Sequence, residues 1–419
     1  MAVNNTFGTP DNSVGNLNGM FKDTYESKLK NLIPEGLKLM KDIKFLQKSK
    51  QPGNIFNSPV ILGAEHGVTF GSSDDDAFNL NPAIAGAIKN AEVRGNPIVM
   101  RSRIGYTALS RAAQGDQAAF EDATKYVVAN MLRSLSKKLE IEMLYGQVGY
   151  ATTSGAVTTV VTIDTAAWAP GIWSGAEGMP IEIRDTTGAT SRGVFTVASV
   201  DMEARTLTMT TNAAAAGVVN TDVLWHMGAY GNEFAGIHKI ITNTGTLFNI
   251  SAAQYNLWKG NSYSASSGAL SFTKLIKAAA RAYEKGSEGK VLALVNPRGW
   301  TDLMSDQAAL RKYDASYSSE SMKNGTRSLT FFSQSGEITI EVSNYVKEGF
   351  AYLLALQDWV RVGSSDVSFR RPGAGAGADQ FFFDIGDAAG LEIRAWSDQC
   401  VFTSRPGANT LITAIVNSA

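Results

Sequence analysis

Histidines are the side chains best suited to bind a metal or transfer a proton near neutral pH. The 419-residue chain has three of them, His66, His226 and His238. None lies in the His-Glu-x-x-His frame that places two zinc ligands on one helix face. The spacing therefore predicts three structural or surface histidines and no histidine-based metal site.

Cysteine and serine chemistry has equally little support in the sequence. Cys400 is the single cysteine, which excludes an internal disulfide and a cysteine zinc cage within one chain. No Gly-x-Ser-x-Gly turn is present to expose a serine nucleophile. We expect Cys400 to pack as a small apolar side chain.

Three further segments have the composition of a binding loop but not its spacing. Gly286–Lys290 lacks the earlier glycine and the following Ser or Thr of a phosphate loop. Gly373–Gly377 leads into an apparent strand, Phe381–Phe383, where a dinucleotide-binding turn would open a helix. Asp74–Asp76 are contiguous, whereas calcium loops space their acids at alternate positions. We therefore predict no catalytic residue, no metal and no cofactor.

The overall composition favours protein contacts over an electrostatic function. The formal net charge is −1, which argues against strong electrostatic binding of nucleic acid by the chain as a whole. Charged residues make up 18%, and charges are depleted at interface cores. No apolar run approaches the roughly 20 residues that cross a bilayer. Residues 1–19 lack a hydrophobic signal core, so we expect a cytoplasmic product with a flexible N-terminus.

Two N-terminal segments contain too little apolar bulk to fold alone. Residues 20–50 are rich in lysine and prone to form helix, and Pro34 interrupts them. Residues 51–110 read as an extended β-arm punctuated by glycine and proline. We expect the apolar side chains of both segments to be buried against other chains. The apolar residues expected at such contacts are Leu32, Ile33, Leu37, Met40, Val60, Ile61, Ile98 and Val99.

The clearest helical pattern covers residues 116–145. Phe120, Val127, Met131 and Leu135 recur at helical spacing, so we expect this stripe to pack against a β-layer. About 30 residues at roughly 1.5 Å each give a rod near 45 Å, longer than most globular helices. The segment therefore predicts a structural strut.

The remainder of the chain predicts a β-rich insertion and a mixed body. Residues 147–232 contain several short strands at close spacing, such as Pro180–Arg184, which suggest a small barrel or sandwich with few contacts to the body. After residue 233, Phe272–Tyr283 has the pattern of an amphipathic helix and Val291–Val295 that of a buried strand.

The order of these pieces resembles the major capsid proteins of tailed bacteriophages, with their Hong Kong 97-like fold. Five stretches resemble particular segments of that family: Ser110–Phe120, Lys138–Gly146, Phe234–Ile237, Ala293–Trp300 and Asp387–Arg394. The resemblance implies an α+β fold. Its parts would be an N-terminal arm (1–50), an E-loop β-arm (51–110), the spine helix of the P domain (111–146), a β-rich insertion (147–232), and the remaining P domain with the A domain (233–419).

The same resemblance implies a structural function. The chain would self-assemble into hexamers and pentamers that form an icosahedral head around double-stranded DNA, which it would touch only non-specifically. Portal, scaffolding and decoration proteins would be further partners, and no membrane is involved. The expected location is the virion capsid, assembled in the host bacterial cytoplasm.

Two other interpretations remain open from the sequence. An encapsulin-like nanocompartment shell would share the fold but enclose an enzyme cargo. A glycan-binding protein or enzyme would use the insertion as its binding module, with Trp168, Trp173 and Trp225 stacking on sugars.

Overall fold

The computed structural model describes residues 37–46, 55–73, 78–106, 117–306, 328–333, 336–369, 382–385 and 390–418. Within these ranges the side chains of residues 117–125, 328, 329, 331, 332 and 384 are not described. Several predicted features lie outside the described residues: Leu32, Ile33, Asp74–Asp76, Gly373–Gly377 and the side chain of Phe120.

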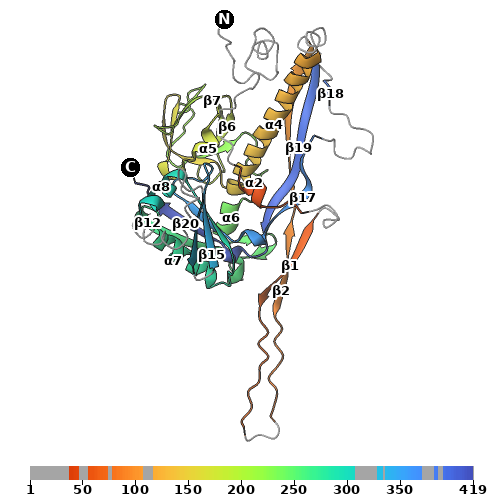
Figure 1. The fold of residues 1–419 in the computed structure, drawn as a ribbon, viewed down its shortest axis with the longest axis vertical. Coiled ribbons are helices and arrows are strands. Elements are labelled where there is room, and N and C mark those ends of the chain that lie inside the picture. The colour runs from red at the N-terminus through yellow and green to blue at the C-terminus, as the bar shows by residue number, and fades with distance from the viewer. Residues whose placement is uncertain are drawn as a thin grey trace, which may run out of the picture.

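The long helix α4 (Gln117–Tyr145) packs along a four-stranded sheet (Figure 1). The central strand is β19 (Gly390–Thr403), and β3 (Asn96–Gly105) pairs with it antiparallel from Gly390 to Gln399. β17 (Trp359–Ser368) and β18 (Phe383–Asp384) pair with its two ends. Side chains four residues apart share one face of a helix, and here that face is buried toward the sheet.

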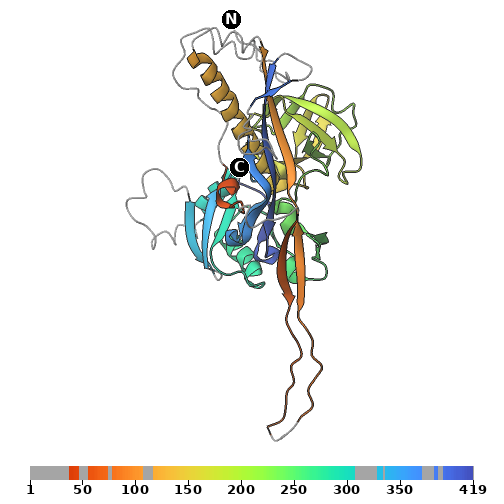
Figure 2. The same cartoon turned by 90° about the vertical axis from the view of Figure 1, so that its right-hand side faces the viewer.

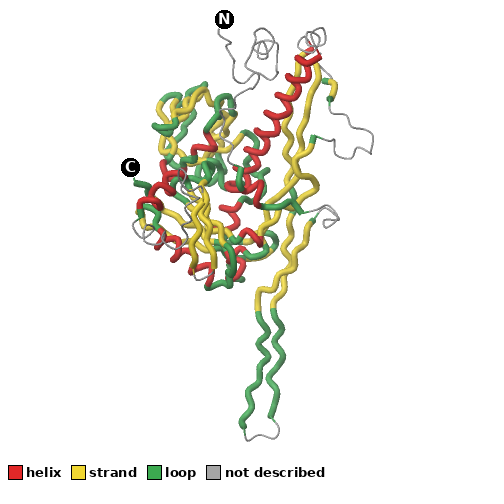
Figure 3. The backbone as a smooth tube through the Cα atoms, in the orientation of Figure 1, coloured by secondary structure: helices red, strands yellow, loops and turns green. Residues whose placement is uncertain are grey.

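A long β-hairpin projects away from the rest of the molecule (Figures 1 and 2). Its paired strands are β1 (Phe56–Gly63) and β2 (Ala87–Val93), which run antiparallel from the pair Phe56 and Val93 to the pair Gly63 and Ala87. Beyond them, residues 64–73 and 78–86 continue side by side without regular strand pairing (Figure 3).

The body is a six-stranded mixed sheet in the order β12-β20-β16-β13-β15-β14. Its strands are β12 (Asn261–Gly268), β13 (Val291–Val295), β14 (Ser328–Ser333), β15 (Gly336–Val342), β16 (Ala351–Leu354) and β20 (Thr410–Ile415). The helices beside it are α6 (Ile237–Thr242), α7 (Phe272–Tyr283) and α8 (Pro297–Ser305). Short elements elsewhere are α2 (Leu39–Asp42), β10 (Thr246–Leu247), β11 (Ile250–Ser251) and three 3-10 turns at Asn256–Trp258, Leu356–Asp358 and Pro406–Ala408.

Strand β13 explains why this sheet lies in the middle of the body. Val291, Ala293 and Val295 join the core that contains the apolar face of α7. Leu292 and Leu294 point the other way, because side chains alternate along a strand, and join the larger core that contains α6. A strand buried on both faces reads as a continuous apolar run.

The insertion is a closed six-stranded barrel in the order β4-β5-β8-β7-β6-β9. Its strands are β4 (Ala151–Val157), β5 (Val160–Ile163), β6 (Pro180–Arg184), β7 (Ser191–Asp201), β8 (Thr206–Met209) and β9 (Val223–His226). Val161, Ile181 and Leu207 are among the fully buried side chains of the barrel. A 3-10 turn, Thr165–Ala167, and the short helix α5 (Pro170–Trp173) join β5 to β6.

One sequence-based boundary differs from the structure. The interpretation of residues 51–110 as one arm is wrong for its last part, because β3 belongs to the sheet under α4 and not to the hairpin. In the barrel, Thr158 takes a positive φ of 53° and turns β4 back into β5.

Candidate assembly surfaces

The three histidines of the chain do not form a metal site in the described structure. His66 is exposed on the hairpin, His226 lies at the end of β9, and His238 lies in α6 with its Nδ1 2.9 Å from the Tyr352 hydroxyl. Burial lowers the pKa of His226 to about 4 and that of His238 to about 3. No group of three His, Cys, Asp or Glu side chains in the described part of the chain could hold a metal ion.

Cys400 and the three tryptophan side chains of the insertion are buried. Cys400 is buried in β19, and burial raises the pKa of its thiol. Trp168 and Trp173 are buried and stack on each other with ring centroids 6.2 Å apart. Trp225 is also buried and meets Tyr230 edge-on at 5.2 Å. The hypothesis that these three indoles stack on sugars is therefore wrong, because none presents a ring face to solvent.

The hairpin presents apolar side chains to solvent along its length. Phe70 is 91% exposed, Leu80 80% and Ile61 75%. Four more large apolar side chains of the same hairpin are exposed: Val68, Phe78, Ile84 and Ile88. Exposed single apolar residues are common on proteins, but a contiguous apolar surface marks an interaction site.

Polar contacts hold the two sides of the distal hairpin together. The backbone N–H of Asn81 donates to Thr69 Oγ1 at 2.8 Å, and its side-chain amide donates to the Val68 carbonyl at 3.0 Å. The backbone N–H of His66 donates to the Ile84 carbonyl at 3.1 Å. These hydrogen bonds join the two sides of the hairpin and leave its apolar side chains exposed to solvent.

The four predicted contact residues of the β-arm are divided between two places. Val60 is half-buried and Ile61 exposed, on opposite faces of β1. Ile98 and Val99 lie opposite Ser397 and Trp396 of β19. Ile98 is half-buried there and Val99 is 54% exposed, so these two residues belong to the body and not to the arm.

The described end of the N-terminal arm packs on its own chain, contrary to the expectation for Leu37 and Met40. Both are half-buried against the main core, and Leu39 between them is fully buried. The buried carboxylate of Glu140 in α4 accepts the backbone N–H groups of Lys38, Leu39 and Met40 at 3.0, 2.9 and 2.9 Å. Sequence reasoning missed Glu140, because one acid among many on a long helix gives no sign that it is buried.

Arg361 of β17 joins Ile43, which follows α2, to the sheet under α4. Its guanidinium donates to the Ile43 carbonyl at 2.8 Å, to Asp366 at 2.8 Å and to Gln399 at 2.9 Å. The predicted packing residues of the helix lie close by in the core, with Val127 and Met131 each 4% exposed and Leu135 1%. α2, α4 and β17 therefore form one rigid unit.

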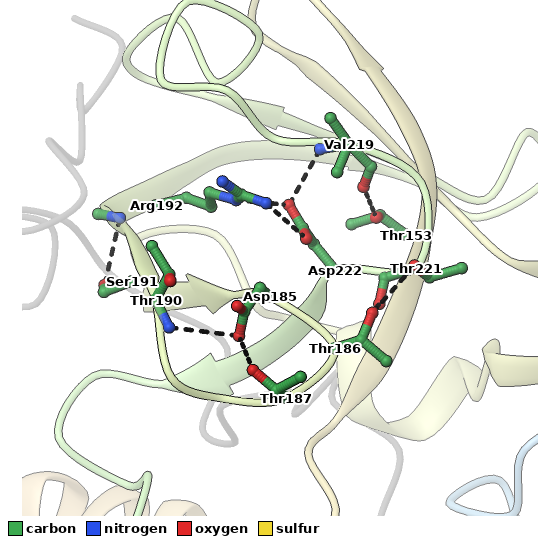
Figure 4. A network of polar contacts seen from close by, with 11 residues as sticks. Thr153, Asp185, Thr186, Thr187, Thr190, Ser191, Arg192, Val219, Thr221 and Asp222 are labelled. Atoms are coloured by element: carbon green, nitrogen blue, oxygen red, sulfur yellow. Dashed lines mark hydrogen bonds and ion pairs between the residues drawn. The ribbon is translucent and has the colours of Figure 1, made fainter.

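The barrel contains its own partly buried ion pair (Figure 4). Arg192 Nε and Nη2 lie 3.1 and 3.4 Å from the two carboxylate oxygens of Asp222, which also accepts the Val219 N–H at 2.9 Å. Nearby, Asp185 accepts Thr187 Oγ1 at 3.0 Å and stabilises the turn after β6. These contacts stiffen one end of the barrel.

The barrel also contacts the body more closely than the sequence suggested. The Ala166 and Trp168 carbonyls each accept a backbone N–H from the body, those of Gly349 and Glu348, at 2.9 Å. Lys347 of the body is buried and donates to the Gly149 carbonyl at 3.1 Å, and burial lowers its pKa to about 7. The expectation of few contacts between the two parts is therefore wrong.

Comparison with solved structures identifies this arrangement as a known fold. The chain is similar to the capsid asymmetric unit of cyanophage A-1(L), with a TM-score of 0.52 at 12% identity, over 89% of this chain and 90% of that chain. The cyanophage P-SCSP1u capsid matches at 0.45 and 11% identity, over 96% and 95%. An encapsulin complex from Synechococcus elongatus matches at 0.40 and 8% identity, over 93% and 92%.

The first of these likenesses confirms the predicted Hong Kong 97-like α+β fold. No protein-family model and no curated protein sequence matches the chain. None of the described helices is both long enough and apolar enough to cross a membrane.

Proposed function

We propose that this chain is the major shell subunit of a tailed-phage head. The observation that carries the proposal is the projecting hairpin, whose Phe70, Leu80 and Ile61 side chains are each at least 75% exposed. Leaving such side chains in water costs roughly 1.5–3 kcal/mol each relative to burial. An interface with another copy recovers that free energy, because the hairpin projects away from the body of its own chain and is not covered by it.

The subunits would group as hexamers and pentamers and close into an icosahedral shell. Rings of one chain are built from head-to-tail contacts that join two different surfaces of neighbouring copies, and a hairpin and a body provide such a pair. Portal, scaffolding and decoration proteins are the proposed further partners. Contacts with packaged double-stranded DNA would be non-specific. They would also be weak, since a net charge of −1 gives no strong overall attraction for phosphates. The shell would assemble in the host bacterial cytoplasm and remain as the virion capsid.

A hairpin truncation tests this proposal. Residues 64–86 are replaced by a short Gly-Ser linker that keeps the paired strands β1 and β2. Because loop changes away from a core cost little, the circular dichroism spectrum and melting temperature should stay close to those of the intact protein. Sedimentation should show that shell-sized particles are lost.

The matched control replaces the barrel turn Thr186–Ala189 with Gly-Ser, which should leave particle formation intact. If the hairpin truncation still forms closed particles of the normal size, the hairpin is not an assembly element.

A further inference from the structure

The segment of the body that joins β15 to β16, residues 343–350, lies against the barrel. The backbone N–H of Gly171 in α5 donates to the Asn344 carbonyl at 2.8 Å. Gly349 packs so closely on the stretch between β5 and β6 that a Cβ added to it would lie 2.7 Å from the Ala166 Cβ. Residues 343–350 are therefore a docking segment, through which the body holds the barrel.

Lys347 lies in this docking segment and is only 5% exposed. Its Nζ donates to the Gly149 carbonyl, between α4 and β4, at 3.1 Å and lies 4.1 Å from the centre of the Tyr145 ring. Its backbone N–H donates to the Tyr145 hydroxyl at 2.9 Å. One side chain therefore joins the end of α4, the start of the barrel and the docking segment.

The amine of Lys347 pairs with no carboxylate among the described residues. The neighbouring acid, Glu348, has its carboxylate 3.0 Å from Arg205 of the barrel and 3.5 Å from Arg298 of α8. Glu142, one turn before Tyr145 in α4, accepts the Phe234 N–H at 3.1 Å. A buried ammonium group is stable only when it is paired and hydrogen-bonded, so this site suits the neutral amine.

A second base lies in the same buried cluster. The Tyr145 hydroxyl is hydrogen-bonded to that of Tyr352, which lies 2.9 Å from Nδ1 of His238. Burial raises the pKa of both tyrosines, so both hydroxyls stay neutral. Burial, and then the charge of Lys347, lower the pKa of His238 to about 3. The cluster thus holds two bases and offers neither of them a counter-charge.

We propose that the junction between the barrel and the body is a pH-dependent latch, which opens when Lys347 takes up a proton. In the closed junction an ammonium group would lose its hydration for one carbonyl and one aromatic ring. Moving the docking segment off the barrel returns Nζ to water. The latch acts within one chain, so it goes beyond the proposed shell function and does not rest on it.

The direction of the pH effect follows from the burial of Lys347, which lowers its pKa from 10.5 to about 7. Between those two values the opened junction keeps a proton that the closed junction releases. Closure is therefore least favourable below pH 7 and becomes more favourable as pH rises from 7 to 10.5. His238 stays neutral in the closed junction above pH 5, so the pH range around 7 reports on Lys347.

Hydrogen exchange on the intact chain tests the latch. The amides of Glu348 and Gly349 donate across the junction to the Trp168 and Ala166 carbonyls, so their exchange reports its opening. After correction for the intrinsic exchange rate, their protection should fall about tenfold from pH 8 to pH 6, as Lys347 passes through its buried pKa. Strand β13 in the middle of the body serves as the internal reference. Junction amides that keep the same protection relative to β13 at both pH values would overturn the latch.

A lysine substitution assigns the effect. Lys347→Met keeps the apolar stem and removes the amine, so junction protection should be the same at pH 6 and pH 8. The matched control is Lys290→Met, whose side chain is 80% exposed, and it should keep the full pH dependence. A folded Lys347→Met protein that keeps the tenfold fall would overturn the role of Lys347.

Circular dichroism reports whether the methionine variant folds. If it does not, the comparison of the junction with β13 in the intact chain still decides whether the latch exists. Neither measurement needs particles, so failure of the latch leaves the shell function standing, and failure of the shell function leaves the latch.

Discussion

Arg205 and Glu348 join the barrel to the body through a two-oxygen ion pair. Nη2 of Arg205 lies 3.2 and 3.0 Å from the two carboxylate oxygens of Glu348. Arg205 occupies the turn between β7 and β8, and Glu348 follows β15 in the body. The Glu348 side chain is only 4% exposed and also lies 3.5 Å from Arg298. The orientation of the barrel relative to α8 is therefore fixed by charge as well as by packing.

Removing Arg205 should destabilise the folded chain measurably. Arg205→Ala leaves a buried carboxylate with only the half-exposed Arg298 beside it, and breaking a buried pair costs about 3 kcal/mol. Chemical denaturation should detect the loss. The control is Lys290→Ala, whose pair with Glu337 involves a lysine that is 80% exposed and should cost less than about 1 kcal/mol. Equal effects of the two substitutions would contradict this reading.

Glu140 should hold the N-terminal arm on the helix. Glu140→Gln replaces one of two accepting oxygens with an amide that donates, so either the Met40 N–H or the N–H groups of Lys38 and Leu39 lose their acceptor. Hydrogen bonds to charged groups contribute about 1.5–3 kcal/mol each, so a loss of about 2 kcal/mol is expected. Limited trypsin digestion should then cut at Lys41 or Lys44 much faster than in the intact protein. Glu177→Gln serves as the control, and unchanged digestion of the Glu140 variant would contradict the anchoring role.

Glu142 should make stability depend on pH. Burial, and then the charge of Glu233, raise its pKa to about 8 from the ordinary 4.5. The folded state therefore keeps a proton that the unfolded chain releases near pH 4.5, so this contribution to stability is full below 4.5 and is lost as pH rises through 8. Glu142→Gln removes that loss.

Thermal melts at pH 5 and pH 9 test this expectation. The variant should gain melting temperature relative to the intact protein on going from pH 5 to pH 9. All other ionisable side chains are the same in the two proteins, so the comparison isolates Glu142. A difference between the two proteins that does not change with pH would contradict the raised pKa.

Two leucines three residues apart on α4 should behave differently. Leu135 is 1% exposed, so Leu135→Asp buries a charge against the sheet and should yield insoluble protein. Leu132 is 43% exposed, so Leu132→Asp should fold and stay soluble. Soluble expression and circular dichroism separate the two effects. A soluble, folded Leu135 variant would contradict the assigned helix face.

Elements with a strong local pattern could be predicted from the sequence. The helix Phe272–Tyr283 has the predicted bounds, since Ser271 caps its first turn by accepting the Lys274 N–H at 3.3 Å. The strand Val291–Val295 also has the predicted bounds, because a short apolar run with glycine nearby fits a strand buried on both faces. In these cases local sequence and tertiary packing favour the same structure.

Elements defined by distant partners could not be predicted in the same way. β3 reads equally well as part of an arm, and its partner β19 lies almost three hundred positions further along the chain. β12 has the sequence NSYSASSG, which resembles a loop, and it becomes a strand only through parallel pairing with β20. Pairing between segments far apart leaves no periodic trace in either one.

The candidate site was predicted in outline only. An exposed arm followed from the lack of apolar bulk in residues 51–110, but the pairing of β3 with β19 in the sheet under α4 did not. The burial of Glu140 and Lys347 could not be predicted either, because a charged residue in a sequence is ordinarily expected to lie on the surface.

Electron microscopy of the intact, purified protein tests the central claim most directly. Expressed at a high level, the chain should form hollow closed shells of uniform diameter, with hexameric and pentameric groups resolved after averaging. A protein that stays monomeric at high concentration under those conditions, with a folded circular dichroism spectrum, would contradict the account.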